Sequence, residues 1–173
     1  MHNRQKKVLE LLEMSGPRLH ELLARLTLSE DAVGDLLQEL FIRLSSSNGL
    51  DNARDPFAYA HRAAINLAFE WRRRQKVNCQ SLDEDCLPVG SSSSPLGKII
   101  RREELEQLLD ATSQLSRLAR DVVVMHYIEQ ESYEEISQRL GKKPHYLRSV
   151  SAKALARLRM LLAGEENRPG RED

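Results

Sequence analysis

The stretch from residue 132 to residue 159 constrains the fold more than any other part of the chain, because it has the pattern of two short helices joined by a tight turn. Ser132 and Glu135 have the S-x-x-E spacing of a capping box, which predicts that a helix begins there. Gly141 can adopt the left-handed conformation that ends a helix, and Pro144 suits the first turn of the next one. The pattern therefore predicts a helix-turn-helix.

The second helix of this pair is predicted to have one apolar face and one cationic face. The side chains that we expect it to bury are Leu147, Val150, Ala154, Leu158 and Leu161. Between Arg139 and Ala163 the chain carries seven Lys and Arg residues and no Asp or Glu. A surface of this charge suits contact with nucleic-acid phosphates, although a helical hairpin with a solvated basic face has the same pattern. Both interpretations stay open on this segment alone.

Apolar residues recur at helical spacing along most of the remaining chain, so the predicted fold class is all-α. Two short helices, 6–14 and 18–26, are expected on either side of the Ser-Gly-Pro sequence at 15–17, because Gly and Pro stand at the edges of the apolar patterns. Ser29 is placed to cap the following helix. A longer helix is expected at about 56–76, beginning with a proline.

The composition changes between residues 77 and 97, which contain two prolines, two glycines, a run of four serines and an Asp-Glu-Asp triplet. Such a segment is typical of a flexible linker. We therefore expect two small helical domains, at 1–77 and 99–163, joined by a flexible acidic linker at 78–98. The polar residues 164–173 are expected to form a disordered tail.

The formal net charge is zero, but the charges are unevenly distributed. Residues 1–78 carry 12 basic and 10 acidic side chains, residues 79–138 carry 5 and 12, and residues 139–173 carry 9 and 4. This asymmetry predicts nucleic-acid contact at two places and an acidic middle segment that screens or regulates them. A further hypothesis is that the acidic segment folds against the basic faces and lowers the DNA affinity of the free chain.

Several function classes have no support in the sequence. No apolar run approaches the roughly 20 residues that cross a bilayer, no signal-peptide pattern is present, and Cys79 and Cys86 indicate neither a zinc site nor a disulfide framework. The five histidines are scattered, and His126 is predicted to be a core residue. Neither a Gly-rich phosphate loop nor a nucleophile motif occurs. We expect a cytoplasmic protein with no membrane insertion, catalysis, small-molecule substrate, cofactor or metal site.

Three motifs stand in order along the chain: DLLQELFIRL at residues 35–44, RAAIN at 62–66 followed by three arginines at 72–74, and the helix-turn-helix pattern at 132–159. In this order they resemble the extracytoplasmic-function (ECF) sigma factors, group IV of the sigma-70 family. The first two are similar to segments of that family's second conserved region, and the third is similar to its fourth region. The stretch 150–155 resembles the iron-uptake subgroup. The resemblance covers most of the chain.

The resemblance implies a bacterial promoter-recognition subunit that binds core RNA polymerase and promoter DNA. The domain at 1–77 would bind the polymerase and the −10 promoter element, and the domain at 99–163 would read the −35 element. The resemblance also implies a partner, an anti-sigma factor, which would hold the free protein inactive by masking both surfaces.

Three sets of side chains are assigned to these contacts by the resemblance. The polymerase set would meet the polymerase clamp, and its members are Asp35, Gln38, Glu39 and Arg43. The strand set would hold the opened promoter strand, and its members are Tyr59, Arg62, Asn66, Arg72, Arg73 and Arg74. The recognition set would meet the −35 DNA, and its members are Lys142, Lys143, His145, Tyr146, Arg148, Ser149, Ala152 and Lys153.

Two of these side chains carry most of the expected sequence reading. Asn66 aligns with the family position that reads an unstacked base, since an amide can both donate and accept at a base edge. Arg148 is the best candidate for a bidentate contact with guanine. Tyr59, Arg62, Asn66 and Arg73 are expected on the outward face of their helix. Each set also has a purely structural interpretation, as a solvated helix face or a polar cap.

A stand-alone helix-turn-helix regulator that binds palindromic operators as a dimer is the rival functional class. It would need a dimerisation surface, and nothing in residues 1–78 resembles a ligand or dimer domain. A protein-interaction adaptor, the third class, would leave the basic helices unexplained. Binding to core polymerase discriminates between the sigma factor and the operator-binding regulator.

Overall fold

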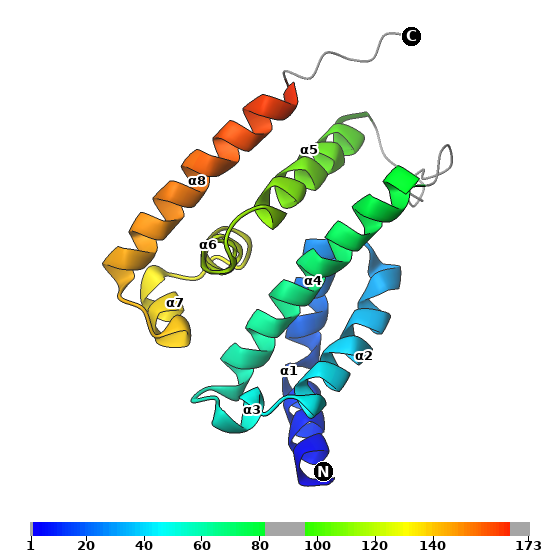
Figure 1. Cartoon of the computed structure of the whole chain (residues 1–173), viewed down its shortest axis with the longest axis vertical. Helices are drawn as coiled ribbons and strands as arrows, with labels where there is room; N and C mark the ends of the chain where they lie inside the picture. The colour runs from blue at the N-terminus through cyan, green and yellow to red at the C-terminus, as the bar shows by residue number, and fades with distance from the viewer. Residues whose placement is uncertain (1, 82–95, 167–173) are drawn as a thin grey trace.

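The computed structural model describes residues 2–81 and 96–166, which are helical apart from short turns (Figure 1). The elements in chain order are α1 (His2–Thr27), α2 (Glu30–Ser46), α3 (Gly49–Asn52), α4 (Pro56–Ser81), α5 (Leu96–Ser113), α6 (Arg117–Val123), the π-helical turn η1 (Val124–Ile128), α7 (Tyr133–Leu140) and α8 (Pro144–Glu166). No strand occurs in the two described ranges, and the predicted all-α class is confirmed.

The first helix runs without interruption through Pro17, so the prediction of two separate helices is wrong. A proline inside a helix lacks the N–H that would bond to the carbonyl four residues before, here that of Glu13, and it costs about 3 kcal/mol. However, the apolar side chains on either side of Pro17 keep one helical phase. Val8, Leu19 and Leu23 are fully buried in the same core, so packing along the whole helix offsets the local cost.

The N-terminal unit, α1 to α4, is a bundle in which α1 packs against both α2 and α4. Its fully buried large side chains include Leu19, Leu23, Leu26, Leu40, Leu44, Ile65, Leu67 and Phe69. Trp71 on α4 is half-buried against the same core. The short helix α3 connects α2 to α4, and Leu50 anchors it in the core. Ser29 stands at the N-cap position of α2 as predicted, but its side chain makes no capping hydrogen bond.

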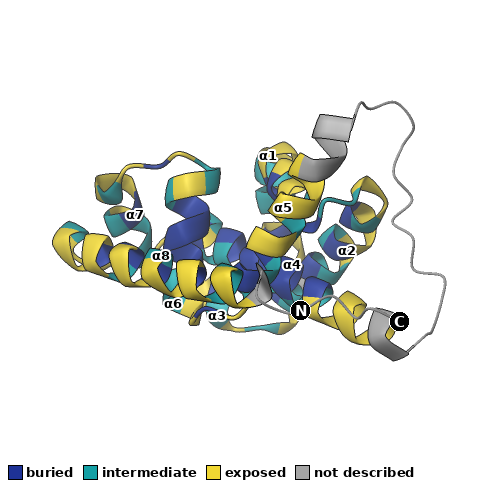
Figure 2. Ribbon diagram, turned by 90° about the horizontal axis from the view of Figure 1, so that it is seen from above, coloured by how far each residue is buried: buried dark blue, intermediate teal, exposed yellow. Residues whose placement is uncertain are grey.

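The C-terminal unit, α5 to α8, is arranged around α8, which packs against α5, α6 and α7. Of the side chains expected to be inside, Leu147, Ala154 and Leu158 are buried, and Val150 and Leu161 are half-buried. Ser151 is buried as well, although the apolar pattern gives no sign of it. The outer side of α8 is exposed along its length (Figure 2).

Helices α4 and α8 extend further than their sequence patterns predict. α4 continues to Ser81, beyond the expected end at about Lys76, while α5 begins at Leu96, where the helical pattern of the sequence resumes. α8 continues to Glu166, which the prediction assigns to the tail. The remaining parts of the predicted linker and tail, residues 82–95 and 167–173, lie outside the described residues.

The N-terminal and C-terminal units are packed directly against each other, with α4 in contact with α5 and α6 (Figure 1). One hydrophobic core contains buried side chains from both units. The C-terminal unit contributes Leu109, Val122, Val124, Met125, Ile136 and Leu147 to this core. One long face of α4 therefore lies against the C-terminal unit, and this placement decides the surroundings of the strand set.

An irregular turn joins α6 to α7. In η1 the amide of Glu129 donates a hydrogen bond to the carbonyl of Val124 (3.0 Å), a bond that spans five residues. Gln130 then adopts a left-handed conformation with φ of +61°, and its side-chain amide donates to the carbonyl of Tyr127 (2.8 Å). This turn directs the chain back toward α4 before α7 begins.

Candidate nucleic-acid interface

The helix-turn-helix is built by the local interactions that its sequence predicts. The Ser132 hydroxyl accepts a hydrogen bond from the amide of Glu135 (3.2 Å), and the Glu135 carboxylate accepts one from the amide of Ser132 (2.7 Å). The bond from the Ser132 amide lowers the pKa of Glu135. Gly141 ends α7 with φ of +64°, in the left-handed region. The predicted capping box and turn are both confirmed.

All eight members of the recognition set are exposed, on the turn after α7 and on the first turns of α8. Lys142 and Lys143 lie on the turn itself, immediately before α8 begins at Pro144. Leu147 and Ser151, on the opposite side of the same turns, are buried and hold α8 against the rest of the unit. The helix therefore presents a continuous basic and polar surface on the side away from the core.

Arg148 is positioned by α7. Its guanidinium donates to the Glu134 carboxylate (2.9 Å) and lies 5.3 Å from the centre of the Tyr133 ring. Both partners of the ion pair are more than half exposed, so the pair is weak and can exchange for a DNA contact. The contacts orient the Arg148 side chain without burying it.

His126 is a structural residue, as its apolar surroundings predict. The His126 Nδ1 atom lies 2.7 Å from the carbonyl oxygen of Glu131, and the His126 ring stacks on Tyr133 with 4.1 Å between ring centres. Because Tyr133 begins α7, this stacking fixes the helix-turn-helix to η1.

Two members of the strand set point from α4 to α6. Arg62 donates to the fully buried carboxylate of Asp121 (2.9 Å), and the side-chain oxygen of Asn66 accepts from the guanidinium of Arg120 (2.6 Å). Both residues lie on the side of α4 away from the N-terminal core, as expected. That side faces the C-terminal unit rather than solvent, because the two units pack together.

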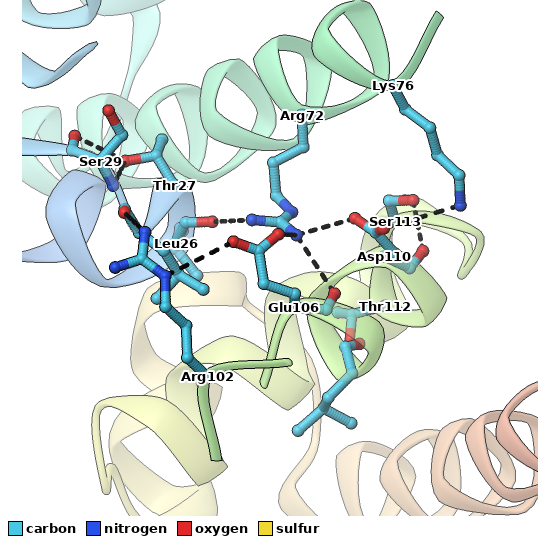
Figure 3. A network of polar contacts seen from close by, with 12 residues as sticks. Leu26, Thr27, Ser29, Arg72, Lys76, Arg102, Glu106, Asp110, Thr112 and Ser113 are labelled. Carbon is cyan, nitrogen blue, oxygen red and sulfur yellow. Dashed lines mark hydrogen bonds and ion pairs between the residues drawn. The ribbon is translucent and has the colours of Figure 1, made fainter. Parts of the chain in front are cut away.

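Arg72 is the most buried member of the strand set, with 6% of its surface exposed. Figure 3 shows its side chain reaching from α4 toward α5, between Glu106 and Asp110. The guanidinium donates to Asp110 (2.8 Å), to the Glu106 carboxylate (3.3 Å) and backbone carbonyl (3.2 Å), and to the Leu26 carbonyl at the end of α1 (3.4 Å). Arg72 thus joins three helices from both units.

The other strand-set members have looser surroundings. Arg73 is exposed and donates to the carbonyl of Ser113 (3.4 Å), and exposed Arg74 lies 3.5 Å from the Glu39 carboxylate. Tyr59 is half-buried, and its hydroxyl lies 3.0 Å from that of Ser47. The six side chains are therefore not a single open surface. Arg73 and Arg74 are exposed, whereas Arg62, Asn66 and Arg72 bond to side chains of the C-terminal unit.

The polymerase set lies along α2, and its members differ in exposure. Asp35 and Gln38 are exposed, whereas Glu39 and Arg43 are half-buried. The Arg43 guanidinium lies 2.8 Å from the Glu70 carboxylate of α4 and also pairs with Glu39. The hydrogen bond from Arg43 lowers the pKa of Glu70.

A shallow open groove of about 570 Å³ lies where α2 meets α4. The side chains that line it are Arg43, Glu70, Arg73, Arg74, Val77 and Asn78. Three arginines against one glutamate give this groove a net positive charge, which suits a phosphate backbone.

Comparison with known proteins identifies the family. A model of the sigma-70 region 4 domain matches residues 105–158. The RNA polymerase sigma-E factor of Streptomyces avermitilis is 32% identical over 126 residues, which cover 72% of this chain and 68% of that protein. The sigma factor CarQ of Myxococcus xanthus is 30% identical over 156 residues, covering 88% and 87% of the two chains.

The chain belongs to the ECF RNA polymerase sigma factors. The ECF sigma factor SigE of Mycolicibacterium smegmatis is 31% identical over 156 residues, and these cover 89% of the present sigma factor but 61% of SigE. The structure of the sigma factor RpoE of Bartonella quintana, solved in complex with the anti-sigma factor NepR, aligns with a TM-score of 0.47 and 19% identity over 94% of this chain and 98% of that one. Membership of this family agrees with the prediction of a transcription factor rather than an enzyme.

Four functionally placed residues of the sigma factor escape the sequence prediction: His61, Asp121, Glu129 and Glu131. Asp121 and Glu131 are buried acids, and burial raises the pKa of each carboxyl. An acid directly before the apolar run 122–125 is a signal that could have pointed to Asp121. Glu129 and Glu131 stand in a polar stretch of the sequence, and only the three-dimensional packing brings them to His61 of α4 and Arg18 of α1.

The described residues were also compared with the requirements of a membrane-spanning helix and of a metal site. Within residues 2–81 and 96–166, none of the helices combines the length and the apolar character that a bilayer crossing requires. The same residues contain no cluster of three or more His, Cys, Asp or Glu side chains arranged to hold a metal ion.

Proposed function

We propose that this sigma factor binds core RNA polymerase in the bacterial cytoplasm and directs transcription from promoters that it reads with two surfaces. The recognition set on α7 and α8 reads the −35 element, and the strand set on α4 holds the opened −10 element. The observation that carries the proposal is the full exposure of the recognition set on a confirmed helix-turn-helix, within the part of the chain that matches sigma-70 region 4.

The −35 contact is supported by the geometry at the start of α8. A recognition helix meets base edges in the major groove with the residues of its first turns, and Arg148 and Ser149 occupy that position. Lys142, Lys143 and Lys153 flank them and are suited to phosphate contacts, which fix the register without reading sequence. A bidentate contact from Arg148 to guanine is worth about 1–3 kcal/mol of discrimination at one base pair.

The −10 contact is supported by the residue types that α4 presents. A row of cationic side chains suits the backbone of a single strand, and the amide of Asn66 suits the edge of an unstacked base. Arg73 and Arg74 already border the positively charged groove between α2 and α4. A strand bound along α4 would therefore pass from this groove toward Arg62.

The polymerase contact is assigned to the outer face of α2. Asp35 and Gln38 are exposed there, off the buried stripe formed by Val33, Leu36 and Leu40. Arg43 and Glu39 lie further along the helix and are tied to α4 through Glu70, which keeps α2 at a fixed angle.

The same proposal includes the domain boundaries, the subgroup of the family and the control of the protein. The domain at 1–77 carries the polymerase and −10 contacts, and the domain at 99–163 carries the −35 contact. We place the chain in group IV of the sigma-70 family, near the iron-uptake subgroup, on the strength of its residues 150–155. Control by an anti-sigma factor is part of the same proposal, and its support is the resemblance of the sequence motifs to the ECF sigma factors.

The test adds the purified chain to bacterial core polymerase that lacks a sigma factor and measures transcription from a genomic promoter library. The wild type is compared with Arg148→Ala, Asn66→Ala and the matched control Arg157→Ala, an exposed arginine further along α8 and outside the recognition set. We expect Arg148→Ala to lose or retarget starts through one base pair of the −35 element, by about 5- to 150-fold. Arg157→Ala should keep the wild-type start sites.

Two results would contradict the proposal in different ways. If the chain forms no complex with core polymerase but binds a palindromic duplex tightly, the operator-binding regulator is the correct class. If transcription starts normally but Arg148→Ala and Arg157→Ala behave alike, the recognition set is wrongly placed while the sigma function stands.

A further inference from the structure

The acids of the C-terminal unit stand where the phosphates of a bound strand would be needed. Asp121 binds Arg62, Asp110 binds Arg72, and the second Asp110 oxygen lies 3.6 Å from the ammonium of Lys76. A carboxylate and a phosphate engage a guanidinium in the same bidentate manner, so the two are competitors for one arginine. The C-terminal unit and a nucleic-acid strand therefore compete for the same side chains of α4.

Arg72 cannot bind the acids of the C-terminal unit and a phosphate at the same time. The side chain of Arg72 is 5% exposed, and its guanidinium is surrounded by acceptors from α1 and α5 (Figure 3). Asp121 is fully buried and holds Nε of Arg62, whose side chain remains 39% exposed. No phosphate can reach Arg72 until the C-terminal unit moves away from α4.

The η1 turn makes a third contact near the start of α4. Because Gln130 is left-handed, its two neighbours Glu129 and Glu131 both reach the N-terminal unit. Glu129 lies 2.7 Å from Nε2 of His61, which is fully buried, and Glu131 accepts from Arg18 of α1 (3.0 Å). Contacts from η1, α6 and α5 are therefore distributed along α4 from His61 to Lys76.

The packing covers part of the strand set and leaves the recognition set and the outer face of α2 exposed. All of the recognition set is exposed, and so are Asp35 and Gln38 of the polymerase set. In this conformation the recognition set and the outer face of α2 are exposed, whereas Arg72 is inaccessible and Arg62 and Asn66 are bound to α6.

We propose that α5, α6 and η1 form an internal lock on α4, which closes the free sigma factor to opened promoter DNA. Docking of the outer face of α2 on polymerase can precede release of the lock, and release exposes Arg72 and frees Arg62 and Asn66 from their partners on α6. The lock rests on the proposed function of the strand set. The apparent affinity of the free chain for a single strand is then its intrinsic affinity multiplied by the small fraction of open molecules.

The closed contact can be trapped in the unmodified chain with a zero-length carbodiimide cross-linker, which joins an amine to a carboxylate in an ion pair. Lys76 and Asp110 are suited to this reagent because their charged atoms lie 3.6 Å apart and both side chains are accessible. We expect mass spectrometry to find the Lys76–Asp110 cross-link in the free chain and to find it reduced in the complex with core polymerase. Absence of the link in the free chain would overturn the lock.

The second experiment removes the lock acids and leaves the strand set intact. In Glu106→Gln/Asp110→Asn, the closed state must bury the Arg72 guanidinium without a countercharge, whereas the open state solvates it. The matched control, Glu103→Gln/Glu104→Gln, makes the same charge change at exposed positions of α5 that have no ion pair in the described chain. The readout is the binding of each free chain to a fluorescent single-stranded −10 oligonucleotide.

We expect the lock variant to bind the oligonucleotide about 10-fold more tightly than the wild type, and the control to bind within about 2-fold of it. If polymerase-dependent transcription is normal but the lock variant and the control bind alike, the lock is refuted. If the cross-link forms but no variant supports promoter opening with polymerase, closure of the two units stands and the proposed function of α4 fails.

Discussion

Gly141 sets the angle between α7 and α8, because its φ of +64° is a conformation that an L-residue with a side chain adopts only at a cost. A Cβ added at this position would meet no heavy atom within 4 Å. Gly141→Ala therefore measures the cost of the left-handed backbone conformation without a steric clash. We expect this variant to lower the free energy of unfolding by about 1 kcal/mol, measured by urea denaturation.

The control for this prediction is Gly34→Ala. Gly34 lies exposed inside α2, it also has open space around it, and it is not among the residues with positive φ. Alanine should stabilise a helix at such a position by up to about 1 kcal/mol. A loss of stability in both variants, or in neither, would contradict the role assigned to the left-handed turn.

Asp121 should make stability fall as the pH rises. Burial raises its pKa in the folded chain above the ordinary value of 3.8, and the hydrogen bond from Arg62 opposes this only in part. The folded chain therefore holds the proton more tightly, and this contribution to stability is complete below the unfolded pKa and is lost as the pH rises through the folded pKa. Asp121→Asn removes the ionisation.

The measurement compares the unfolding free energies of wild type and Asp121→Asn at a series of pH values from about 4 to 7, the range above the unfolded pKa of an aspartate. We expect the difference to shift in favour of the variant as the pH rises, because asparagine carries no charge to be buried. Glu104→Gln, at an exposed position of α5, should give a curve parallel to the wild type. A shift in the opposite direction would mean that the Arg62 pair outweighs the burial of Asp121.

At the scale of the element, α1 shows how packing overrides a local signal. Replacing Pro17 with alanine restores a backbone donor to the carbonyl of Glu13 and removes the crowding ring. Greater freedom of the unfolded chain offsets part of this gain. We expect Pro17→Ala to raise the free energy of unfolding by about 2 kcal/mol, measured by chemical denaturation.

The exposed position of Pro17 makes the stability change of Pro17→Ala easy to interpret. The residue is exposed, so alanine removes no buried contact there. Ser15→Ala, at a half-buried position of the same helix, controls for the general effect of alanine on helix propensity and should change stability by less than about 0.5 kcal/mol. A destabilised Pro17→Ala variant would show that α1 depends on the geometry that proline imposes.

Elements defined by neighbouring residues could be predicted from the sequence, and elements defined by distant packing could not. The capping box of Ser132 and Glu135 and the turn at Gly141 depend on residues close together in the chain, so their pattern is visible there. The exposed recognition set follows from the same local periodicity. In contrast, the continuity of α1 through Pro17 depends on a core formed with α2 and α4.

The surroundings of the strand set were beyond sequence reasoning for a similar reason. Arg62 and Asp121 are 59 positions apart, and Arg72 and Asp110 are 38 apart. The charge distribution predicts that acids of the middle segment could meet basic faces, but it names no pair. Which arginine meets which carboxylate is decided by how α4 packs on α5 and α6.

The whole molecule should unfold as one unit, because its larger hydrophobic core contains buried side chains of both halves. Trp71, the sole tryptophan of the sequence, belongs to the N-terminal unit, so its fluorescence reports on that half. Far-ultraviolet circular dichroism reports on all helices. We expect the two signals to give coincident thermal transitions in the wild type.

The lock variant Glu106→Gln/Asp110→Asn provides the contrast. Weakening the contact between α4 and α5 should reduce the coupling of the two halves, so that the fluorescence and dichroism midpoints separate by several degrees. The Glu103→Gln/Glu104→Gln control should keep them together. Separate transitions in the wild type would show that the shared core contributes little to cooperativity.

The central position of Arg72 has a consequence for genetics. If the proposed roles hold, loss of Arg72 removes both a contact with promoter DNA and the restraint that α5 imposes, so the two effects oppose each other in the cell. Loss of Asp110 or Glu106 is not opposed in this way, since these acids serve closure alone. In a genetic selection for spontaneously active alleles, we therefore expect the substitutions to lie in α5 and α6. Substitutions in α4 should mainly cause loss of function.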